Sequence, residues 1–531
     1  MRRVIAHEAE SRKALLAQRL PQGVLSPMKD GPVILSPREA VDQQRPLHVV
    51  FVAAECVPYA CVGGLSEVVA SLPKALQALP GHPVRGTIVM PKYAPMTPER
   101  FAGMTTAPTD IFWSTYAGVT QPWQVWQGEH PADSTVSVVW LEQPDTLGKQ
   151  QAVYEGDTVQ QQWRFGAFSQ AVLGWLQHAN IAADVLHLHD WHVAPLAGML
   201  KGARWHHPEV WGQTHSLLTL HNIAYQGEWG WQNPLMHGVM EADALNTVSP
   251  SYRDEILAEP AGAGLAGLLN TRAAQLSGIL NGIDTVRFNP STDPDLPQPY
   301  SVGHTLPDIL AAKTAAKRLV LRRLGVRELP KDDAVLRQRP LLGMVGRLVS
   351  QKGLDYLLPA LEGLAYADTA DVVFVGSGDP RFESRIRHLI AHFPNVMAHL
   401  GFDEVLARQV FAACDWLLMP SVFEPCGLSQ LMALRYGTPV LARRTGGLRD
   451  TVVDWHTNPE LSTGIVVDTP DGTAMNYLLG QAMALYTAPH AQHGTVYAGM
   501  VQRALAADNS WGRSAQAYAN TYAQLCGVGV A

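Results

Sequence analysis

The sequence predicts an α/β protein built from two doubly wound, Rossmann-like domains that face each other across a deep cleft. Short runs rich in β-branched residues alternate with amphipathic segments of helical length, which is typical of a parallel sheet covered by helices on both faces. The alternation stops in a proline-rich stretch and then starts again, so a second domain of the same kind follows the first. A length of 531 residues also exceeds what one ordinary domain needs.

The expected strands are the buried-looking runs themselves, and many of them end in polar residues. In the first domain they are 47–55, 135–142, 184–190, 216–222 and 244–250, and in the second 341–348, 371–379, 396–402, 416–421, 439–445 and 464–468. Ligands of doubly wound domains bind beyond the carboxyl ends of the strands. Two such domains therefore place a cleft between facing strand ends.

The same pattern along the chain predicts its domain boundaries. We expect a polar N-terminal extension over 1–45, a first domain over 46–285, a linker over 286–305, a second domain over 306–510 and a C-terminal helix over 511–531 that packs back on the body.

Composition argues against several classes of partner. The formal net charge of -7 disfavours nucleic acid or an anionic membrane as the main ligand. No uncharged apolar run reaches the roughly 18 residues of a membrane span, and charged residues stand where an N-terminal export signal needs its apolar stretch. The five cysteines are odd in number and lack CxxC spacing, which disfavours a disulfide framework. We therefore expect a cytoplasmic protein.

A pair of glycines follows the first expected strand. Gly63 and Gly64 lie just before a helical stretch. Glycines here let the backbone approach a ligand closely, and the helix that follows offers its N-terminus to an anion. A tight turn without a function explains the pair equally well.

A run of histidines, HLHDWH, ends another expected strand. His187 and His189 share one face of that strand. Zinc binding is an alternative, but the run lacks HExxH spacing and an evident partner carboxylate, so we expect no metal and no cofactor. We expect two of the three histidines to be structural and one imidazole to hydrogen-bond a sugar hydroxyl. The next strand end supplies His221 and Asn222.

Two cations stand in the loop that follows the first strand of the second domain. Arg347 and Lys352 lie five positions apart in GRLVSQKG. A diphosphate needs donors of this kind, because arginine offers a rigid fork and lysine a movable point charge. The alternative is a pair of solvated surface cations.

A carboxylate precedes an expected helix near the end of the second domain, in FEPCGLSQLMALRYG. The helix N-terminus and the Ser429 hydroxyl would bind phosphate or ribose, and Glu424 would face the sugar, where a carboxylate stabilises positive charge. A helix-capping role is the alternative for Glu424. Cys426 would be a small buried hydrophobe.

Together these segments closely resemble the bacterial glycogen synthases and plant starch synthases. The resemblance runs from about residue 47 to residue 525. It rests on VGGLSEVVASLPKAL, HLHDWH, LHNIAYQG, NTVSPSYRDEI, LSGILNGID, GRLVSQKGLD, GSGDP and FEPCGLSQLMALRYGTPVLARRTGGLRDTV.

The resemblance implies a GT-B-type hexosyltransferase. Such an enzyme moves glucose from ADP-glucose to the non-reducing 4-hydroxyl of an α-1,4-glucan such as glycogen, with retention of configuration and without a metal. By this likeness Arg347 and Lys352 would neutralise the departing diphosphate, His189 would contact the glucose hydroxyls, and Glu424 would sit beside the transferring sugar. The other implied contacts are with the donor, from Gly63, Gly64, Asn281, Gly427, Leu428 and Ser429, and on the acceptor side, from Glu67, His221 and Asn222.

The chain departs from the family pattern at several positions. Cys61 stands where the family has a lysine that contacts the donor, and Glu67 where it usually has aspartate. Val422 replaces a common arginine, and the stretch after Gly227 is shorter than usual.

These departures leave three hypotheses open. The chain is an active glucan synthase that uses ADP-glucose, a related retaining transferase with another donor or a smaller acceptor, or a weakened homologue that binds glucan or nucleotide as a scaffold. Retention of Arg347, Lys352, His189 and Glu424 favours an enzyme, whereas Cys61 favours the scaffold. Lys92 or Arg164 would be alternative sources of the missing cation.

Overall fold

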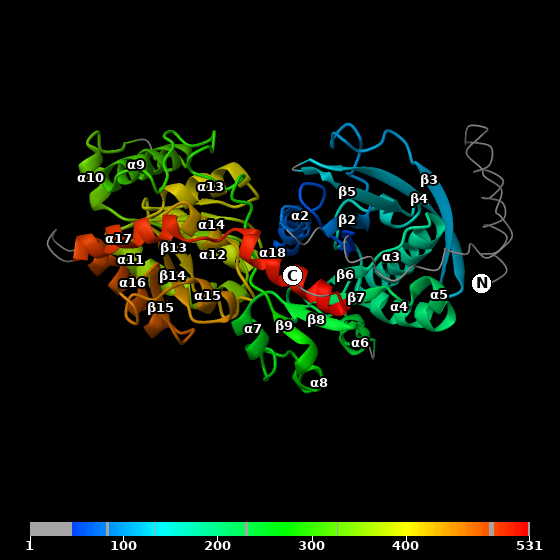
Figure 1. The fold of residues 1–531 in the computed structure, drawn as a ribbon. Coiled ribbons are helices and arrows are strands. Elements are labelled where there is room, and N and C mark those ends of the chain that lie inside the picture. The colour runs from blue at the N-terminus through cyan, green and yellow to red at the C-terminus, as the bar shows by residue number, and fades with distance from the viewer. Residues whose placement is uncertain are drawn as a thin grey trace.

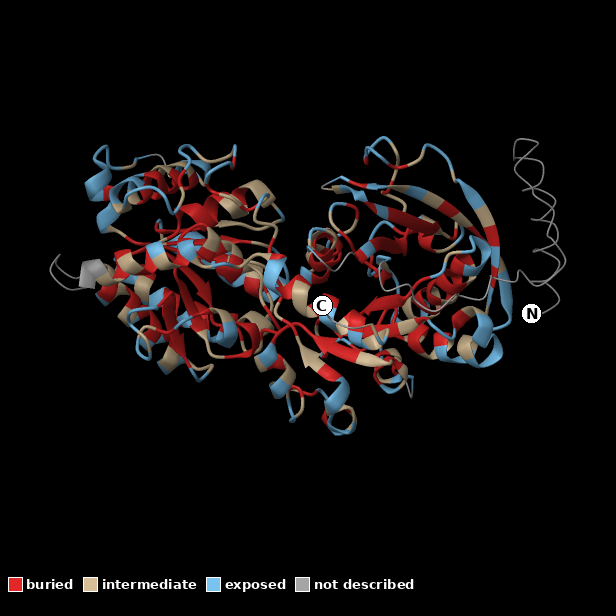
Figure 2. Cartoon of the chain, viewed as in Figure 1, coloured by how far each residue is buried: buried red, intermediate tan, exposed pale blue. Residues whose placement is uncertain are grey.

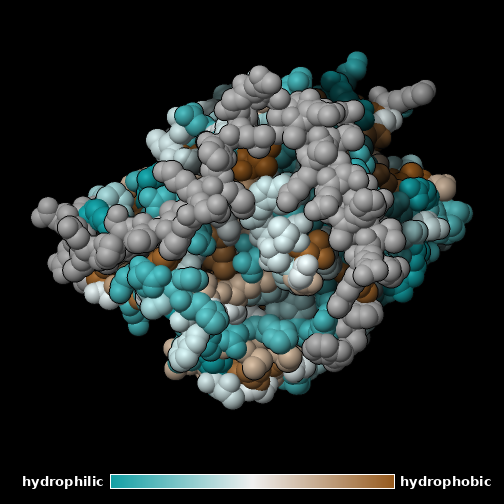
Figure 3. All heavy atoms as spheres, turned by 90° about the vertical axis from the view of Figure 1, so that its right-hand side faces the viewer, coloured by the Kyte–Doolittle hydropathy of each residue, from teal (hydrophilic) through white to brown (hydrophobic). Residues whose placement is uncertain are grey.

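A computed structural model describes residues 45–80, 84–131, 133–228, 232–326, 328–487 and 493–528. Residues 1–44 of the expected N-terminal extension lie outside the described residues. No helix in the described part of the chain is long and apolar enough to cross a membrane. Seen from the side of the first domain, much of the described surface is hydrophilic, with hydrophobic residues in small areas (Figure 3).

The first domain is built on a sheet whose described strands number nine, in the order β3-β4-β5-β2-β1-β6-β7-β8-β9. The strands from β5 through β2 and β1 to β9 run parallel, and β3 and β4 extend the sheet as an antiparallel hairpin. Their bounds are β1 Leu47–Val52, β2 Val84–Pro91, β3 Asp110–Tyr116, β4 Val119–His130, β5 Asp133–Glu142, β6 Val185–His189, β7 His215–Leu220, β8 Ala244–Thr247 and β9 Leu276–Gly278.

Helices cover both faces of this sheet (Figure 1). Helix α2 lies on the side of the second domain, whereas α3 and α4 lie on the outer side. The helices are α2 Gly64–Gln77, α3 Thr158–His178, α4 Pro195–His206, α5 Pro208–Trp211, α6 Pro234–Glu241, α7 Pro250–Glu255 and α8 Ala266–Thr271, with short 3-10 turns η1 Leu147–Lys149 and η2 Ala273–Gln275.

The second domain has a sheet of six described strands, all parallel, in the order β12-β11-β10-β13-β14-β15. The strands are β10 Leu341–Val345, β11 Asp371–Val375, β12 Val396–His399, β13 Trp416–Met419, β14 Val440–Arg443 and β15 Gly464–Val467. The helices around it are α9 Leu306–Arg323, α10 Asp333–Gln338, α11 Leu354–Tyr366, α12 Pro380–His392, α13 Glu404–Ala413, α14 Ser429–Arg435, α15 Gly446–Thr451, α16 Gly472–Thr487 and α17 His493–Ala506, with η3 Ser350–Lys352.

Both faces of the second sheet are buried, and each has its own apolar core (Figure 2). Along β10 and β11 successive side chains enter opposite cores: Leu342 and Phe374 enter one, Leu341 and Val373 the other. A sheet buried on both sides needs continuous apolar strands, which explains why these runs are readable in the sequence.

The last helix, α18 Trp511–Leu525, crosses from the second domain back to the first (Figure 1). Its Tyr518 hydroxyl accepts a hydrogen bond from Asn246 Nδ2 at 2.7 Å, and its Tyr522 hydroxyl lies 2.8 Å from His187 Nδ1. Tyr518 and Tyr522 are fully buried in the core of the first domain. The chain end therefore ties the two domains together.

The predicted fold class is confirmed, and each expected strand overlaps one strand of the structure. Strands β2, β3, β4 and β9 were not expected. The β3–β4 hairpin turns at Ala117 and Gly118, whose φ angles are 50° and 78°. Alanine at positive φ is unusual, so the sequence carries only a weak signal for this turn.

Candidate active site

A cavity of about 860 Å³ lies between the two domains, at the carboxyl ends of strands from both sheets. One wall comes from the loops after β1, β6 and β7 of the first domain, and the other from the loops after β10 and β13 of the second. This is the position at which doubly wound folds bind ligands.

Glu55 shapes the glycine loop after β1. Its carboxylate, only 2% exposed, accepts hydrogen bonds from the amides of Val62 at 2.7 Å and Gly63 at 3.1 Å, and the Tyr154 hydroxyl donates to its other oxygen. Burial raises the pKa of Glu55, while these hydrogen bonds and Arg347 act in the opposite direction. Both Glu55 and Tyr154 line the cavity.

Gly64 marks a close approach between the domains. A Cβ atom at this position would lie 3.3 Å from Cδ1 of Leu428 in the second domain. The Ser249 hydroxyl donates to the Pro425 carbonyl oxygen at 2.6 Å on the same side of the cavity. A side chain at position 64 would therefore require the Leu428 side chain to shift by a few tenths of an ångström.

The histidines of the HLHDWH run do not all reach the cavity. His187 and His189 are fully buried, and His189 Nδ1 lies 2.9 Å from Nε2 of His221. His221 and Asn222 line the cavity, whereas His189 meets it only through His221. Burial lowers the pKa of His187 and His189 well below the ordinary value and that of His221 to about 3, so all three rings are neutral near pH 7.

Two neighbours in the run that were not predicted to contact ligand do line the cavity. His192 is 3% exposed, and neither of its ring nitrogens has a hydrogen-bond partner within the described residues. Asp190 accepts from the His221 amide at 2.7 Å, and burial raises its pKa to about 7. Unpaired buried polar atoms at a cavity wall are suited to bind a polar ligand.

The described residues hold no cluster of three or more His, Cys, Asp or Glu side chains placed to bind a metal. His187 lies 2.7 Å from the Thr219 hydroxyl and also bonds Tyr522, so both of its nitrogens have protein partners. The absence of a catalytic metal stays a prediction.

The predicted cations and carboxylate converge on the second-domain wall. Lys352 Nζ forms an ion pair with Glu424, and the Ser421 hydroxyl donates to the same carboxylate at 2.8 Å. Glu424 is 5% exposed, so its charge is balanced by these two groups. Arg347 is exposed and reaches Gln351 Oε1 at 3.5 Å, the limit of a hydrogen bond. Arg347, Lys352 and Glu424 all line the cavity.

The loop from Gly427 to Ser429 completes this wall. Gly427 has a φ of 74°, and a Cβ atom there would meet the Gln430 amide at 2.3 Å, so both the conformation and the space require glycine. The Ser429 hydroxyl donates to the Val345 carbonyl at 3.1 Å. Leu428 and Asn281 also line the cavity, and Asn281 Oδ1 is buried without a partner among the described residues.

Glu67 takes part in an ion bridge between the domains. Arg287 donates from Nη1 to both Glu67 oxygens at 3.0 and 2.9 Å, and its Nη2 lies 2.8 Å from Glu404 on α13. Cys61 is exposed near this bridge, and the Ser66 hydroxyl lies 3.2 Å from its sulfur. Although part of the residue is exposed, desolvation by the surrounding protein raises the pKa of the Cys61 thiol, and the charges of Glu67 and Glu55 act in the same direction, so the thiol carries no charge at neutral pH.

Neither alternative cation replaces the missing lysine in the cavity. Lys92 is buried in an ion pair with Glu142 at 3.1 Å and stacks over Trp126. Arg164 lines a different pocket. The structure thus brings together Gly63, Gly64, Glu67, His221, Asn222, Asn281, Arg347, Lys352, Glu424, Gly427, Leu428 and Ser429 around one cavity and leaves His189 behind its wall.

Sequence reasoning missed an aromatic ring at the rim of the cavity. Phe402 lines it from the loop after β12, with 83% of its surface exposed. Its run, VMAHLGF, predicts only a strand by its apolar residues, although an aromatic residue at a strand end is a usable signal for a site.

The chain matches two family models. One, described as starch synthase catalytic domain, covers residues 48–271, and the other, glycosyl transferases group 1, covers residues 327–492. A glycogen synthase of Bacillus subtilis is 32% identical over 509 residues, which are 90% of this chain and 98% of the relative. A glycogen synthase of Burkholderia thailandensis is 37% identical over 511 residues, 90% of each chain.

Solved structures show the same likeness. The catalytic domain of starch synthase IV from Arabidopsis thaliana, bound to ADP and acarbose, superposes with a TM-score of 0.79 at 30% identity and covers 91% of this chain and 100% of its own. A sucrose-phosphate synthase from Thermosynechococcus elongatus has a TM-score of 0.57 at 18% identity, covering 91% of this chain and 100% of its own, which is a likeness of fold alone.

We predict that acid destabilises the fold through His192. Burial lowers its pKa to about 3, below the 6.5 of a free imidazole. As the pH falls below 6.5, His192 takes up a proton in the unfolded chain, whereas the buried ring in the folded chain stays neutral. Stability is therefore lost between pH 6.5 and about 3, by about 1.4 kcal/mol per pH unit. Between about pH 7 and pH 5, the melting temperature of His192→Leu should therefore fall less than that of wild type, as measured by differential scanning fluorimetry.

The matched control for this test is His237→Leu, at an exposed histidine of α6. An equal fall in melting temperature for His192→Leu and wild type would contradict the assignment.

Proposed function

Because this chain belongs to the family of bacterial glycogen synthases and plant starch synthases, we propose that it transfers glucose from ADP-glucose to the non-reducing 4-hydroxyl of an α-1,4-glucan, with retention of configuration. It is a glucosyltransferase of the GT-B fold. The observation that carries the proposal is the convergence of Arg347, Lys352 and Glu424 on one interdomain cavity.

The second-domain wall is suited to a departing nucleoside diphosphate. Arg347 offers an exposed fork of donors, and Lys352 pairs its ammonium group with Glu424 at the cavity wall. The amides at the start of α14, beside Gly427 and Ser429, add further donors. The diphosphate gains negative charge as the sugar bond breaks, so cations fixed there lower the barrier more than they strengthen ground-state binding.

In this proposal Glu424 acts on the transferring sugar. Its carboxylate lines the cavity beside Lys352 and is held by the Ser421 hydroxyl. A negative charge at this position stabilises the oxocarbenium-like centre that forms during transfer.

The exposed ring of Phe402 suits the nucleotide base. A large apolar side chain that is 83% exposed at a cavity rim is unfavourably solvated, and covering it with a planar group lowers the free energy. We assign it to stacking with the base of the donor.

The first-domain wall supplies neutral hydrogen-bonding groups for the glucose hydroxyls. His221, His192 and Asn222 line the cavity. We therefore assign to them the hydrogen bonds with the glucose hydroxyls that were expected of His189. His189 then acts as a positioning residue, because its Nδ1 lies 2.9 Å from the His221 ring.

The two alternative hypotheses make different demands on the site. Lys352 and Glu424 form a largely buried ion pair at the cavity wall. A scaffold that only binds glucan has no need of such an ion pair. A different donor nucleotide remains the second candidate, because Cys61 removes one family cation. A cytoplasmic location is also proposed, supported by the odd number of cysteines and their lack of CxxC spacing.

We expect the purified protein to transfer glucose from ADP-glucose to glycogen and to retain this activity after prolonged EDTA treatment. The assay compares ADP-glucose with UDP-glucose, each with and without glycogen. Preference for UDP-glucose would favour the second hypothesis, and binding without transfer would favour the scaffold. Activity lost in EDTA and restored by a stoichiometric divalent ion would overturn the metal-free assignment.

We predict that Arg347→Ala and Lys352→Ala each lower the transfer rate by about tenfold to over a hundredfold. Removing a charge-assisted hydrogen bond from a desolvated site costs about 1.5–3 kcal/mol. The measurement is kcat and KM with ADP-glucose and glycogen. The control is Arg381→Ala, whose side chain is 57% exposed on α12 outside the cavity. Activity within twofold of wild type in both variants would place the diphosphate elsewhere.

We predict that Cys61→Lys strengthens donor binding. The thiol is neutral, and the neighbouring Val62 and Glu67 line the cavity, so an ammonium group from position 61 would reach it. The restored cation should contribute about 1–2 kcal/mol, a five- to thirtyfold gain in affinity for ADP-glucose, less where water and salt screen it. Isothermal titration measures this gain.

The matched control is Cys61→Met, which adds length without charge. Arg287 lies close enough to position 61 to repel a second cation there. Whether the affinity for ADP-glucose rises or falls therefore distinguishes a missing cation from a repelled one. If Cys61→Lys binds ADP-glucose no more tightly than Cys61→Met, the hypothesis that this loop lacks a cation is wrong.

A further inference from the structure

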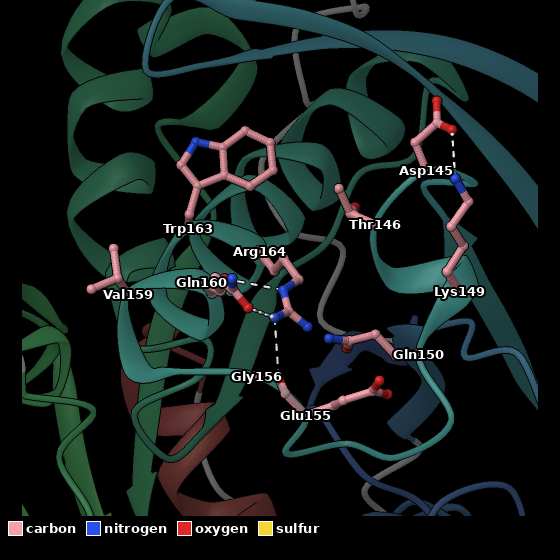
Figure 4. Close-up of a pocket in the computed structure, with 10 residues that line it drawn as sticks. All are labelled: Asp145, Thr146, Lys149, Gln150, Glu155, Gly156, Val159, Gln160, Trp163 and Arg164. Atoms are coloured by element: carbon pink, nitrogen blue, oxygen red, sulfur yellow. Dashed lines mark hydrogen bonds and ion pairs between the residues drawn. The ribbon is translucent and has the colours of Figure 1, made fainter.

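A second pocket, of about 680 Å³, lies on the first domain beside the start of α3 (Figure 4). It is bounded by the turn η1 on one side and by the first two turns of α3 on the other. Its walls carry an indole ring, two cationic side chains, two carboxylates and two amides. No role in the interdomain site uses these groups.

One of the amides is buried without a partner. Gln150 is 5% exposed, and its Nε2 makes no hydrogen bond within the described residues. Figure 4 shows this amide turned toward the Arg164 guanidinium across the pocket. A buried donor without a partner costs free energy, which a ligand hydroxyl in the pocket would offset.

The charges around the pocket balance. Lys149 pairs with Asp145 at 3.0 Å. Arg164 donates to the Glu155 carbonyl oxygen at 3.0 Å and to Gln160 Oε1 at 3.2 Å. Two cations and two carboxylates give no net charge, which favours a neutral ligand over an anion. With Trp163 they form the mixture of an aromatic face and hydroxyl-binding groups that suits a sugar ring.

The pocket is the immediate neighbour of the interdomain cavity. Thr158 and Gln161 line the cavity, whereas Val159 and Gln160, on the same turn of α3, line the pocket. The two hollows are thus separated by one helix, whose diameter is about 10 Å. A polymer that extends from the cavity on this side needs to cross only α3 to reach the pocket.

We propose that this pocket binds a stretch of the α-glucan acceptor that lies outside the cleft, an inference that rests on the proposed function. The pocket holds the chain while its non-reducing end occupies the cavity. Long acceptors therefore gain affinity from the pocket, and acceptors too short to cross α3 do not.

The test compares glycogen with maltotriose as acceptors for two variants. Gln150→Leu removes only the unpartnered amide, since the backbone carbonyl of Gln150 keeps its bond from the Ala94 amide at 2.9 Å. Lys149→Ala changes an exposed side chain and leaves the core untouched. The control is Lys201→Ala, an exposed, ion-paired lysine on α4 that lines neither hollow.

We expect both pocket variants to raise KM for glycogen about two- to tenfold, the effect of removing one hydrogen bond. KM for maltotriose, KM for ADP-glucose and kcat should stay at wild-type values. An unchanged KM for glycogen overturns the proposal, as does an equal rise for maltotriose. Inorganic phosphate that raises the melting temperature of wild type but not of Gln150→Leu would identify an anion site instead and also overturn it.

Failure of this inference is distinguishable from failure of the proposed function. If wild type transfers no glucose to any acceptor, the proposed function fails. Retardation of the same variants in native gels that contain glycogen then still tests the pocket. Weaker retardation of Gln150→Leu and Lys149→Ala than of Lys201→Ala supports the pocket, and equal retardation overturns it.

Discussion

The cavity depends on the carboxyl ends of two sheets being held face to face, and the last helix of the chain contributes to that constraint together with the bonds from Ser249 to Pro425 and from Arg287 to Glu67 and Glu404. Helix α18 leaves the second domain and buries Tyr518 and Tyr522 in the core of the first. Its hydrogen bonds end on Asn246 and His187, which lie on strands next to the site. The same helix therefore ties the domains together and supports the strand that carries the histidines.

The two walls of the cavity differ in charge, because the first is built from buried neutral rings and the second from an ion pair. On the first-domain wall, burial lowers the pKa of His192 and His221, so these rings stay neutral and act as hydrogen-bonding groups. On the second-domain wall, Lys352 and Glu424 balance each other's charge while both line the cavity. Under the proposed function, a neutral sugar and a charged diphosphate would meet different environments on opposite walls of one cavity, which suits a reaction that separates them.

Much of the fold and part of the site could be predicted from the sequence, for a physical reason. Strands buried on both faces read as continuous apolar runs, and residues directly after them lie at the ligand-binding edge. That reasoning located Arg347, Lys352 and Glu424 at the cavity. The resemblance assigned the sugar contact to His189, which ends a strand that is buried along its whole length, whereas the structure places His192, three residues beyond, at the cavity; the course of the loop after β6 is set by folding and cannot be read from the pattern of the strand. The sequence pattern also does not predict contacts between distant segments. Glu55 and Tyr154 are 99 positions apart in the chain and come into contact only in the folded protein.

The bridge from Glu67 through Arg287 to Glu404 has a consequence for turnover. One guanidinium joins helix α2 of the first domain to helix α13 of the second, so the cleft cannot widen at this edge without breaking at least one of the two ion pairs. All three side chains are partly exposed, at 20% to 36%, and dissolved salt weakens such pairs. Opening of the cleft, a step that can limit product release, is thereby coupled to the ionic strength of the medium through this bridge, of which only Glu67 lines the cavity.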